Sequence, residues 1–242
     1  MSELVHGRHA VFHLIQAKRR KVDRLHLLKS LEKEEAPLIQ LARSQKIPVS
    51  FADPAFFTNK LGSATHQGVV AETSAYPYVR FDEVAGESFV LLLDEIQDPQ
   101  NLGALCRSAY LLGVQGIIIP ENRSASVTAG ACQASVGAVE YLKIARVSSI
   151  ASALEILKEN QFWIYGADMQ GTKILHEEKF PPKVALVIGN EERGLRKLVR
   201  ERCDILLKIP TMKAEVDSLN ASVAGGILMY EIFRQQGKTL AQ

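Results

Sequence analysis

A hydroxyl and an amide lie two positions apart near the C-terminal end of the chain, in the segment VDSLNASVA (residues 216–224). Ser218 and Asn220 precede apolar residues that recur at helical spacing. A helix that begins here has free backbone N–H groups in its first turn, and Ser218 is a suitable N-cap. Taken alone, the segment fits either a simple helix cap or a ligand-binding site.

A second polar segment, DEIQDPQNLG (94–103), follows an apolar run and leads into a helix that carries Arg107. Pro99 restrains the turn, Gly103 permits a close backbone approach, and Asn101 is a candidate helix cap. Arg107 is either an ordinary surface arginine or a fixed fork for a phosphate group.

The third segment is VIGNEERGL (187–195), in which an apolar run leads into Gly189, an acidic turn and Gly194. Backbone exposed at Gly189 can contact a small ligand, and Glu191 can orient polar groups or pair with an arginine. The alternative is a charged surface turn. The chain lacks the GxGxxG and GxxxxGK[ST] phosphate cradles, and His176 is the one histidine after residue 66. Dinucleotide, P-loop and histidine-base chemistry are therefore not indicated.

Two series of alternating helix-like and strand-like stretches are expected to position these segments. In residues 1–75, helices are predicted at 8–17, near 37–44 and around 56–61, and strands at 25–28, 48–51 and 68–71. This alternation indicates a small α/β domain. Residues 76–88 contain Pro77, Gly86 and several charges, and are interpreted as a linker.

The second series occupies residues 89–242. Buried parallel strands are expected at 89–93, 116–119, 141–144, 162–165, 184–188 and 205–209, with helices near 101–112, 149–159 and 195–200. Sheets of this kind bind ligands beyond the carboxyl ends of their strands. The three polar segments follow such ends.

Composition limits the class of protein. The 242 residues are 47% hydrophobic, and no apolar run approaches the ~20 residues of a membrane span. The N-terminus has no signal-peptide pattern. The three cysteines are too far apart for a metal knuckle and suit reduced thiols in a cytoplasm, so we expect a cytoplasmic protein without a metal or membrane.

The net charge of +2 is unevenly distributed, because the first thirty residues hold seven lysines and arginines against two acids. Such a cluster attracts phosphate backbones, although it also fits a solvated helix end. The candidate RNA-contacting residues are Arg8, Arg19, Arg20 and Lys21.

Together, the three polar segments resemble the signature motifs of the SpoU family of RNA 2′-O-ribose methyltransferases, which belongs to the trefoil-knotted SPOUT superfamily. The matching patterns are Asn101-x-Gly103-x3-Arg107, Gly189-x-Glu191-x2-Gly194 and Ser218-Leu219-Asn220-x-Ser222. The stretch SVGAVE (135–140) is a further family-like element, and residues 7–11 and 66–71 look like the L30e-like substrate-binding domain of the family. The resemblance is closest to the bacterial subgroup that methylates a guanosine ribose in 23S rRNA.

The resemblance implies a knotted C-terminal domain that binds S-adenosylmethionine, an RNA substrate, and a homodimer whose active site lies near the subunit interface. The catalytic group would be Asn101, Arg107, Glu191, Ser218 and Asn220. The residues that hold the cofactor, mainly through main-chain atoms, would be Gly189, Ile209 and Leu219. The sequence departs from the family pattern in a longer loop at Thr211–Ala214 and at Lys143, where proline is frequent.

Three other interpretations remain. A tRNA ribose methyltransferase would share the motifs but often lacks an N-terminal domain of this kind. A non-catalytic RNA-binding factor is disfavoured because the whole catalytic group is present. A Rossmann-type methyltransferase is disfavoured because the first strand of the second series leads into Asp-Pro-Gln-Asn rather than a glycine-rich loop.

Overall fold

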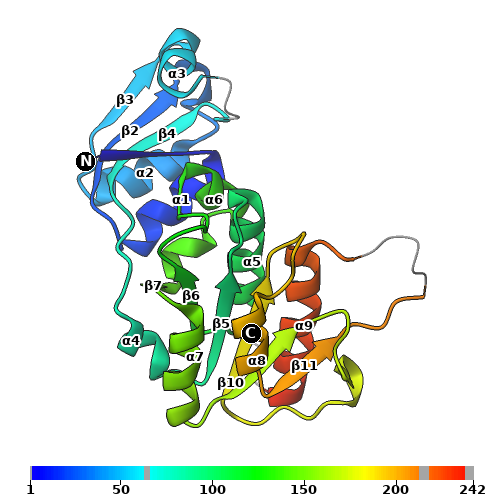
Figure 1. Cartoon of the computed structure of the whole chain (residues 1–242). Helices are drawn as coiled ribbons and strands as arrows, with labels where there is room; N and C mark the ends of the chain where they lie inside the picture. The colour runs from blue at the N-terminus through cyan, green and yellow to red at the C-terminus, as the bar shows by residue number, and fades with distance from the viewer. Residues whose placement is uncertain (1, 63–65, 213–217, 238–242) are drawn as a thin grey trace.

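A computed structural model describes residues 2–62, 66–212 and 218–237. Over these residues the strands form a four-stranded sheet and a seven-stranded sheet (Figure 1). The predicted α/β class with a parallel sheet is confirmed.

The smaller sheet belongs to the N-terminal part of the chain and has the strand order β1-β4-β2-β3. The β2–β3 pair is parallel, whereas β4 runs antiparallel to both β1 and β2. All the elements predicted for residues 1–75 are present, and the edge strand β1 is an addition. The elements are β1 (Ser2–His6), α1 (Arg8–Ala17), β2 (Val22–Leu28), α2 (Ala36–Ser44), β3 (Val49–Ala52), α3 (Pro54–Leu61) and β4 (Val69–Ser74).

The larger sheet has the order β7-β6-β5-β10-β8-β11-β9, and its neighbouring strands are paired in parallel. Its strands are β5 (Phe89–Asp94), β6 (Gly116–Pro120), β7 (Lys143–Val147), β8 (Trp163–Ala167), β9 (Lys173–Ile174), β10 (Val184–Gly189) and β11 (Ile205–Lys208). All six predicted strands exist, but β7 begins two residues late because residues 138–141 form a 3-10 turn.

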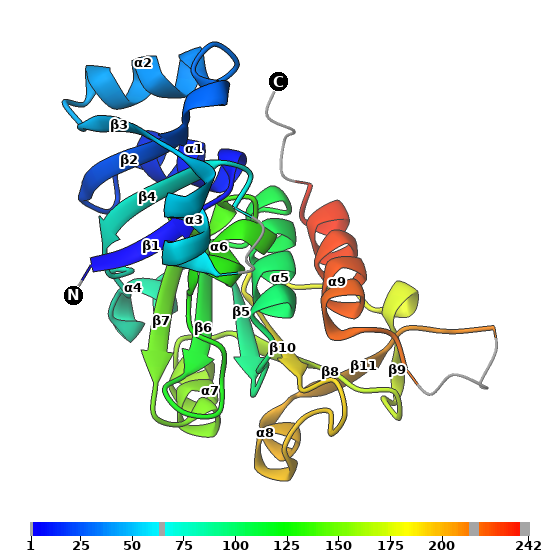
Figure 2. The ribbon, with the colours of Figure 1, turned by 90° about the horizontal axis from the view of Figure 1, so that it is seen from above.

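Helices cover both faces of the larger sheet (Figure 2). On one face, Leu105 of α5 (Pro99–Leu111) and Leu228 of α9 (Ala221–Gln236) belong to the same buried cluster as Leu91. On the other face, apolar side chains of three helices belong to one buried cluster with Val90 and Leu92 of β5. These helices are α4 (Phe81–Ala85), α7 (Ile150–Glu159) and α8 (Lys197–Arg202). A further short helix, α6 (Ala129–Ala134), was not predicted, because its small residues show no apolar periodicity.

The connection between the two sheets is packed against the protein. Tyr76 is 5% exposed, and its hydroxyl donates to the carbonyl oxygens of Val139 and Leu142 at 3.0 Å each. Further along the connection, Val84 and Ala85 of α4 are buried. Residues 76–88, interpreted above as a linker, therefore join the two parts through buried contacts.

None of the described helices is long and apolar enough to cross a membrane. The three cysteines are free thiols, with Cys106 and Cys132 buried. Within the described ranges, no group of three or more His, Cys, Asp or Glu side chains could hold a metal ion.

We predict that Gly103→Ala destabilises the protein by roughly 1–3 kcal/mol, the usual cost of overpacking. A Cβ at Gly103 would lie 2.5 Å from Ala134 Cβ and 2.6 Å from the Ala131 oxygen, so α5 and α6 would have to separate. The matched control is Gly130→Ala, whose Cβ would have 3.6 Å to its nearest neighbour. Urea unfolding measures both variants, and equal stabilities would contradict this account of the α5–α6 contact.

Candidate active site at the carboxyl edge of the sheet

The candidate residues gather where strands β5 and β10 end. Asp94 at the end of β5 is in register with Gly189 at the end of β10. Because the strands are parallel, the loops that follow them leave the sheet at the same edge. This is the edge at which sheets of this type bind ligands.

The first contact joins all three polar segments through the carboxamide of Asn101. Asp98 caps α5 by accepting from the backbone N–H of Gln100 at 2.9 Å, so the expectation that Asn101 is the cap is wrong. The Asn101 side chain is therefore available elsewhere. Its Nδ2 donates to Glu191 Oε1 at 2.6 Å, and its Oδ1 accepts from Asn220 Nδ2 at 3.0 Å.

Asn220 is the N-cap of α9. Its Oδ1 accepts from the backbone N–H groups of Ser222 at 2.9 Å and Val223 at 3.4 Å, and from the Ser222 hydroxyl at 2.6 Å. The prediction that Ser218 caps this helix is therefore wrong, because the helix begins two residues later than that cap requires. Ser218 is exposed just before the cap.

The hydrogen bonds of the helix end determine how the two amides are oriented. Because Asn220 Oδ1 faces the N–H groups of α9, its Nδ2 faces Asn101 Oδ1. The Asn101 amide is then oriented with Nδ2 towards the carboxylate of Glu191. The start of α9 thereby sets the position of a carboxylate carried by a different loop.

The loop that carries this carboxylate is a tight turn. Asn190 and Gly194 exchange two backbone hydrogen bonds, and Asn190 Oδ1 accepts from the backbone N–H groups of Glu192 and Arg193. A Cβ at Gly189 would lie 2.3 Å from the Gly194 carbonyl carbon. Gly189 is therefore required by the packing of the turn, whether or not its backbone also contacts a ligand.

An ion pair between the buried Asp94 and the partly exposed Arg196 joins this loop to the end of β5. Asp94 is fully buried and accepts from Arg196 through the backbone N–H at 2.9 Å and Nε at 2.7 Å. The next residue, Glu95, has a φ of 62°, and its carbonyl accepts from Asn190 Nδ2 at 3.0 Å. Asp94 and Arg196 were not singled out from the sequence, although a charged residue that ends a buried apolar strand is a usable signal.

Arg107 is exposed on α5, six residues beyond Asn101, or roughly 9 Å along the helix axis. It forms no hydrogen bond or ion pair with a described residue. Glu191 accepts from Asn101 and forms no ion pair with Arg107 in the described part of the chain. Within one chain, the structure thus brings Asn101, Glu191 and Asn220 together and leaves the guanidinium of Arg107 outside their hydrogen bonds.

The expected cofactor residues lie around the same edge. Ile209 follows β11 at its carboxyl end, and Leu219 is 38% exposed directly before the α9 cap. No described residue hydrogen-bonds to the main chain of Leu219. The Thr211–Ala214 loop departure falls partly on residues 213–217, which lie outside the described residues.

For Arg20, the expectation of an RNA-contacting residue is wrong. Its side chain is fully buried, and its guanidinium forms an ion pair with the buried Glu140. Hydrogen bonding to Glu140 raises the pKa of Arg20 even though burial alone would lower it.

The other three basic candidates are engaged in different ways. Arg19 donates to the carbonyl oxygens of Leu142 and Pro77. Arg8 is about one-third exposed and pairs with two glutamates of the N-terminal part. Lys21 is 81% exposed and pairs with Asp23. The four residues therefore do not form one free basic surface, and Lys21 is the most accessible of them.

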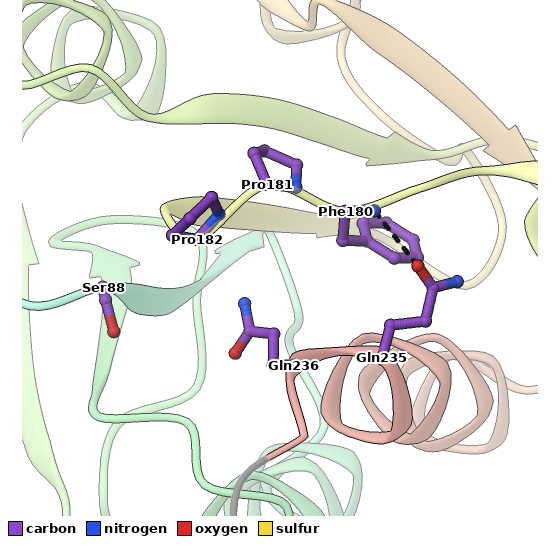
Figure 3. Close-up of a pocket in the computed structure, with 6 residues that line it drawn as sticks. All are labelled: Ser88, Phe180, Pro181, Pro182, Gln235 and Gln236. Atoms are coloured by element: carbon purple, nitrogen blue, oxygen red, sulfur yellow. Dashed lines mark hydrogen bonds between the residues drawn. The ribbon is translucent and has the colours of Figure 1, made fainter.

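A cavity of about 360 Å³ has none of the candidate site residues in its lining. Figure 3 shows the six residues that line it. Two residues that line it lie just before strands, since Ser88 directly precedes β5 and Pro182 is two residues before β10, so it opens at the amino edge of the sheet. Gln235 Oε1 accepts from the backbone N–H of Phe180 on its wall. The cavity is therefore separate from the Asn101 cluster.

Comparison with known proteins identifies the family of this chain. Residues 88–230 match the SpoU rRNA methylase family. The chain belongs to this family. Residues 4–79 also match the substrate-binding domain of RNA 2′-O ribose methyltransferases.

Relatives match this SpoU-family chain along nearly its whole length. YacO of Bacillus subtilis (strain 168), described as a TrmH-family tRNA/rRNA methyltransferase, is 38% identical over 97% of this chain and 96% of its own length. The 23S rRNA (guanosine-2′-O-)-methyltransferase RlmB of Salmonella typhimurium is 37% identical over 98% of this chain and 100% of its own. The crystal structure of AviRb from Streptomyces viridochromogenes with AdoMet has a TM-score of 0.84 at 24% identity, covering 98% and 91% of the two chains, and is similar in fold.

The assignment of the α9 cap leads to a stability prediction. We expect Asn220→Ala to lower the free energy of unfolding by about 1 kcal/mol, the usual cost of removing an N-cap. Ser218→Ala should change it by less than about 0.5 kcal/mol, as for an uninvolved surface residue. Denaturant titrations compare the two variants, and a larger loss for Ser218→Ala would restore Ser218 as the cap.

Proposed function

We propose that this protein transfers a methyl group from S-adenosylmethionine to a ribose 2′-hydroxyl in RNA, with a guanosine of 23S rRNA as the target. Membership of the SpoU family and the RlmB relatives support the reaction and the RNA class. The observation that carries the proposal is the hydrogen-bonded chain Glu191–Asn101–Asn220, which draws three distant segments to one edge of the sheet.

The residues at this edge fit a cofactor held by main-chain atoms. Gly189 ends β10 at this edge, and the main chain of Leu219 is free of described partners beside an exposed side chain. Ile209 leaves the sheet at the same edge and would complete the cradle. When bound, S-adenosylmethionine supplies a methyl group that is activated by the positive charge on sulfur.

The protein's own residues would align the nucleophile and stabilise charge. A ribose hydroxyl is a weak nucleophile, so alignment and removal of its proton are the main requirements. Arg107 binds the phosphate beside the target ribose and favours the negative charge that develops on the oxygen. Asn101, Ser218 and Asn220 position the nucleotide, and Glu191 fixes the site loop through its bond with Asn101.

We further propose a homodimer, with a second copy covering an exposed apolar face of α5 and α9. The two helices lie side by side (Figures 1 and 2). Leu111 on α5 and Val223, Ile227 and Tyr230 on α9 are 39–67% exposed. The α9 residues recur at helical spacing, and burying apolar side chains of this size on a partner is favourable. Arg107 is exposed on α5 one helical turn before Leu111, which supports a role for it in the active site of the partner.

Three finer features belong to the same proposal. The C-terminal sheet is expected to contain the trefoil knot of the SPOUT superfamily, and the N-terminal sheet to be L30e-like. An rRNA substrate and free thiols fit the cytoplasm. A tRNA substrate is the alternative, since YacO is described as a tRNA/rRNA methyltransferase.

Labelled S-adenosylmethionine incubated with 23S rRNA or with tRNA tests the proposal. We expect transfer to the rRNA at a ribose 2′-oxygen, located by nuclease mapping. Arg107→Ala should lower the rate by roughly 10²–10³-fold, because the developing charge loses its stabilising group. The affinity for the methyl donor, measured by calorimetry, should remain close to that of the wild type.

The matched control is Arg80→Ala, which removes an exposed arginine that pairs with Asp82 away from the site. It should transfer methyl groups at the wild-type rate. Near-normal turnover by Arg107→Ala would refute the proposed role of Arg107. Transfer to tRNA alone would refute the rRNA assignment.

A further inference from the structure

A buried ion pair joins the N-terminal part of the chain to the methyltransferase sheet. Arg20 Nε donates to Glu140 Oε2 at 3.0 Å, and Nη2 donates to Glu140 Oε1. Nη2 also lies 3.1 Å from the sulfur of Cys132, and Nη1 pairs with Glu3 at 3.2 Å. The side chains of Arg20 and Glu140 are 0% and 1% exposed. All three guanidinium nitrogens of Arg20 therefore have partners within the protein.

Tyr76 forms a second contact layer around this pair. The guanidinium carbon of Arg20 lies 5.0 Å from the centroid of its ring, and that of Arg19 lies 5.2 Å away. The Tyr76 hydroxyl donates to the carbonyl oxygens of Val139 and Leu142, on either side of Glu140. Burial raises the pKa of Tyr76, so this hydroxyl remains a donor.

The backbone next to Glu140 is shaped to receive helix α1. Gly137 has a φ of 83°, and a Cβ there would lie 2.6 Å from His13 Cβ and 3.3 Å from Ala10 Cα. The hydroxyl of Tyr141 and His13 Nδ1 are 3.0 Å apart. The SVGAVE element (135–140) is thus a seat for the N-terminal part rather than a piece of the Asn101 cluster.

An ion pair of this kind restricts relative orientation. The guanidinium is planar, so a two-point contact with a carboxylate fixes both distance and angle. If either charge is removed, the other is left buried without its partner, which is strongly destabilising for the contact. The N-terminal part is therefore held in one orientation relative to the Asn101–Glu191–Asn220 cluster.

We propose that Arg20 and Glu140 are positioning residues, which set the displacement between RNA bound by the N-terminal part and the methyl-transfer site. This inference rests on the proposed function. A fixed displacement favours a folded RNA, whose target ribose lies at a set distance from the recognised element. A short unstructured RNA reaches the site without engaging both parts, so its methylation does not depend on the junction.

Kinetics on two RNAs test the positioning role. For a structured 23S rRNA fragment, Arg20→Met and Glu140→Gln should each lower kcat/KM by roughly ten- to a hundredfold, since small misplacements of a reacting group are costly. Donor affinity should not change. For a short unstructured oligonucleotide that contains the target guanosine, the variants and the wild type should have the same low kcat/KM.

The thiol of Cys132 reports on the junction without any activity. It is 1% exposed under Arg20, and burial raises its pKa to about 12, so alkylation near pH 7.5 is slow in the closed protein. Both single variants should accelerate it. Trypsin releases Cys132 in peptide 124–143, apart from Cys106 in 81–107 and Cys203 in 203–208. Unchanged labelling of these two thiols excludes general unfolding.

Two further variants separate positioning from a loss of charge. Glu3→Gln removes the 42% exposed partner of the same arginine and should behave as wild type in both assays. Arg20→Met with Glu140→Met replaces the buried pair by apolar side chains, a change that is often tolerated in protein interiors. This double variant should restore the protection of Cys132 and most of the kcat/KM for the structured fragment.

The outcomes are distinguishable. The inference would be overturned if the single variants exposed Cys132 but methylated the structured fragment at the wild-type rate. It would also be overturned if the single variants methylated this fragment more slowly while Cys132 remained protected. An absence of transfer by the wild type would instead refute the proposed function, while the alkylation pattern would still show whether the junction is closed.

Discussion

One carboxamide holds the site together. The two ends of the Asn101 side chain bond to groups on different segments, a carboxylate in the loop after β10 and an amide at the start of α9. The amide of Asn220 is oriented in turn by the N–H groups of its own helix. Every hydrogen bond in this series has the same donor-to-acceptor direction, from the start of α9 to the carboxylate of Glu191. The positions of three segments therefore depend on side chains that are correct in both place and orientation.

Most of the fold could be predicted because the central strands are buried on both faces. Strands such as β5 and β10 are continuous apolar runs, and such runs are recognisable without knowledge of their neighbours. The missed elements lack such a signal. The helix α6 is built from small residues, and β9 is two residues long. The order of strands in the sheet depends on contacts between distant segments, which local patterns do not contain.

The sequence was sufficient to predict which residue types form the site. It was not sufficient to predict which side chains contact one another. Asn101, Glu191 and Asn220 were selected from their residue types in the three polar segments and from the resemblance of these segments to the SpoU motifs, and their side chains meet. The caps were assigned to the wrong residues because Asp98 and Asn220 lie close to Asn101 and Ser218, and any of these side chains can cap a helix. Arg20 was misread because a count of charges does not distinguish a solvated arginine from one enclosed with a glutamate. To make that distinction one must know that Glu140, which is far from Arg20 in the sequence, lies next to it in the folded protein.

The seat formed by residues 135–140 has a consequence for how such proteins diversify. The N-terminal part and the sheet share a continuous apolar interior, in which Leu14 and Val139 belong to the same cluster. If recombination exchanged the first 75 residues between relatives, their packing against residues 135–140 would be lost. The packing would be kept only if residues 135–140 were inherited together with the first 75. Substitutions on the two sides of this contact are thus expected to be correlated, and the two parts are not expected to be exchanged independently.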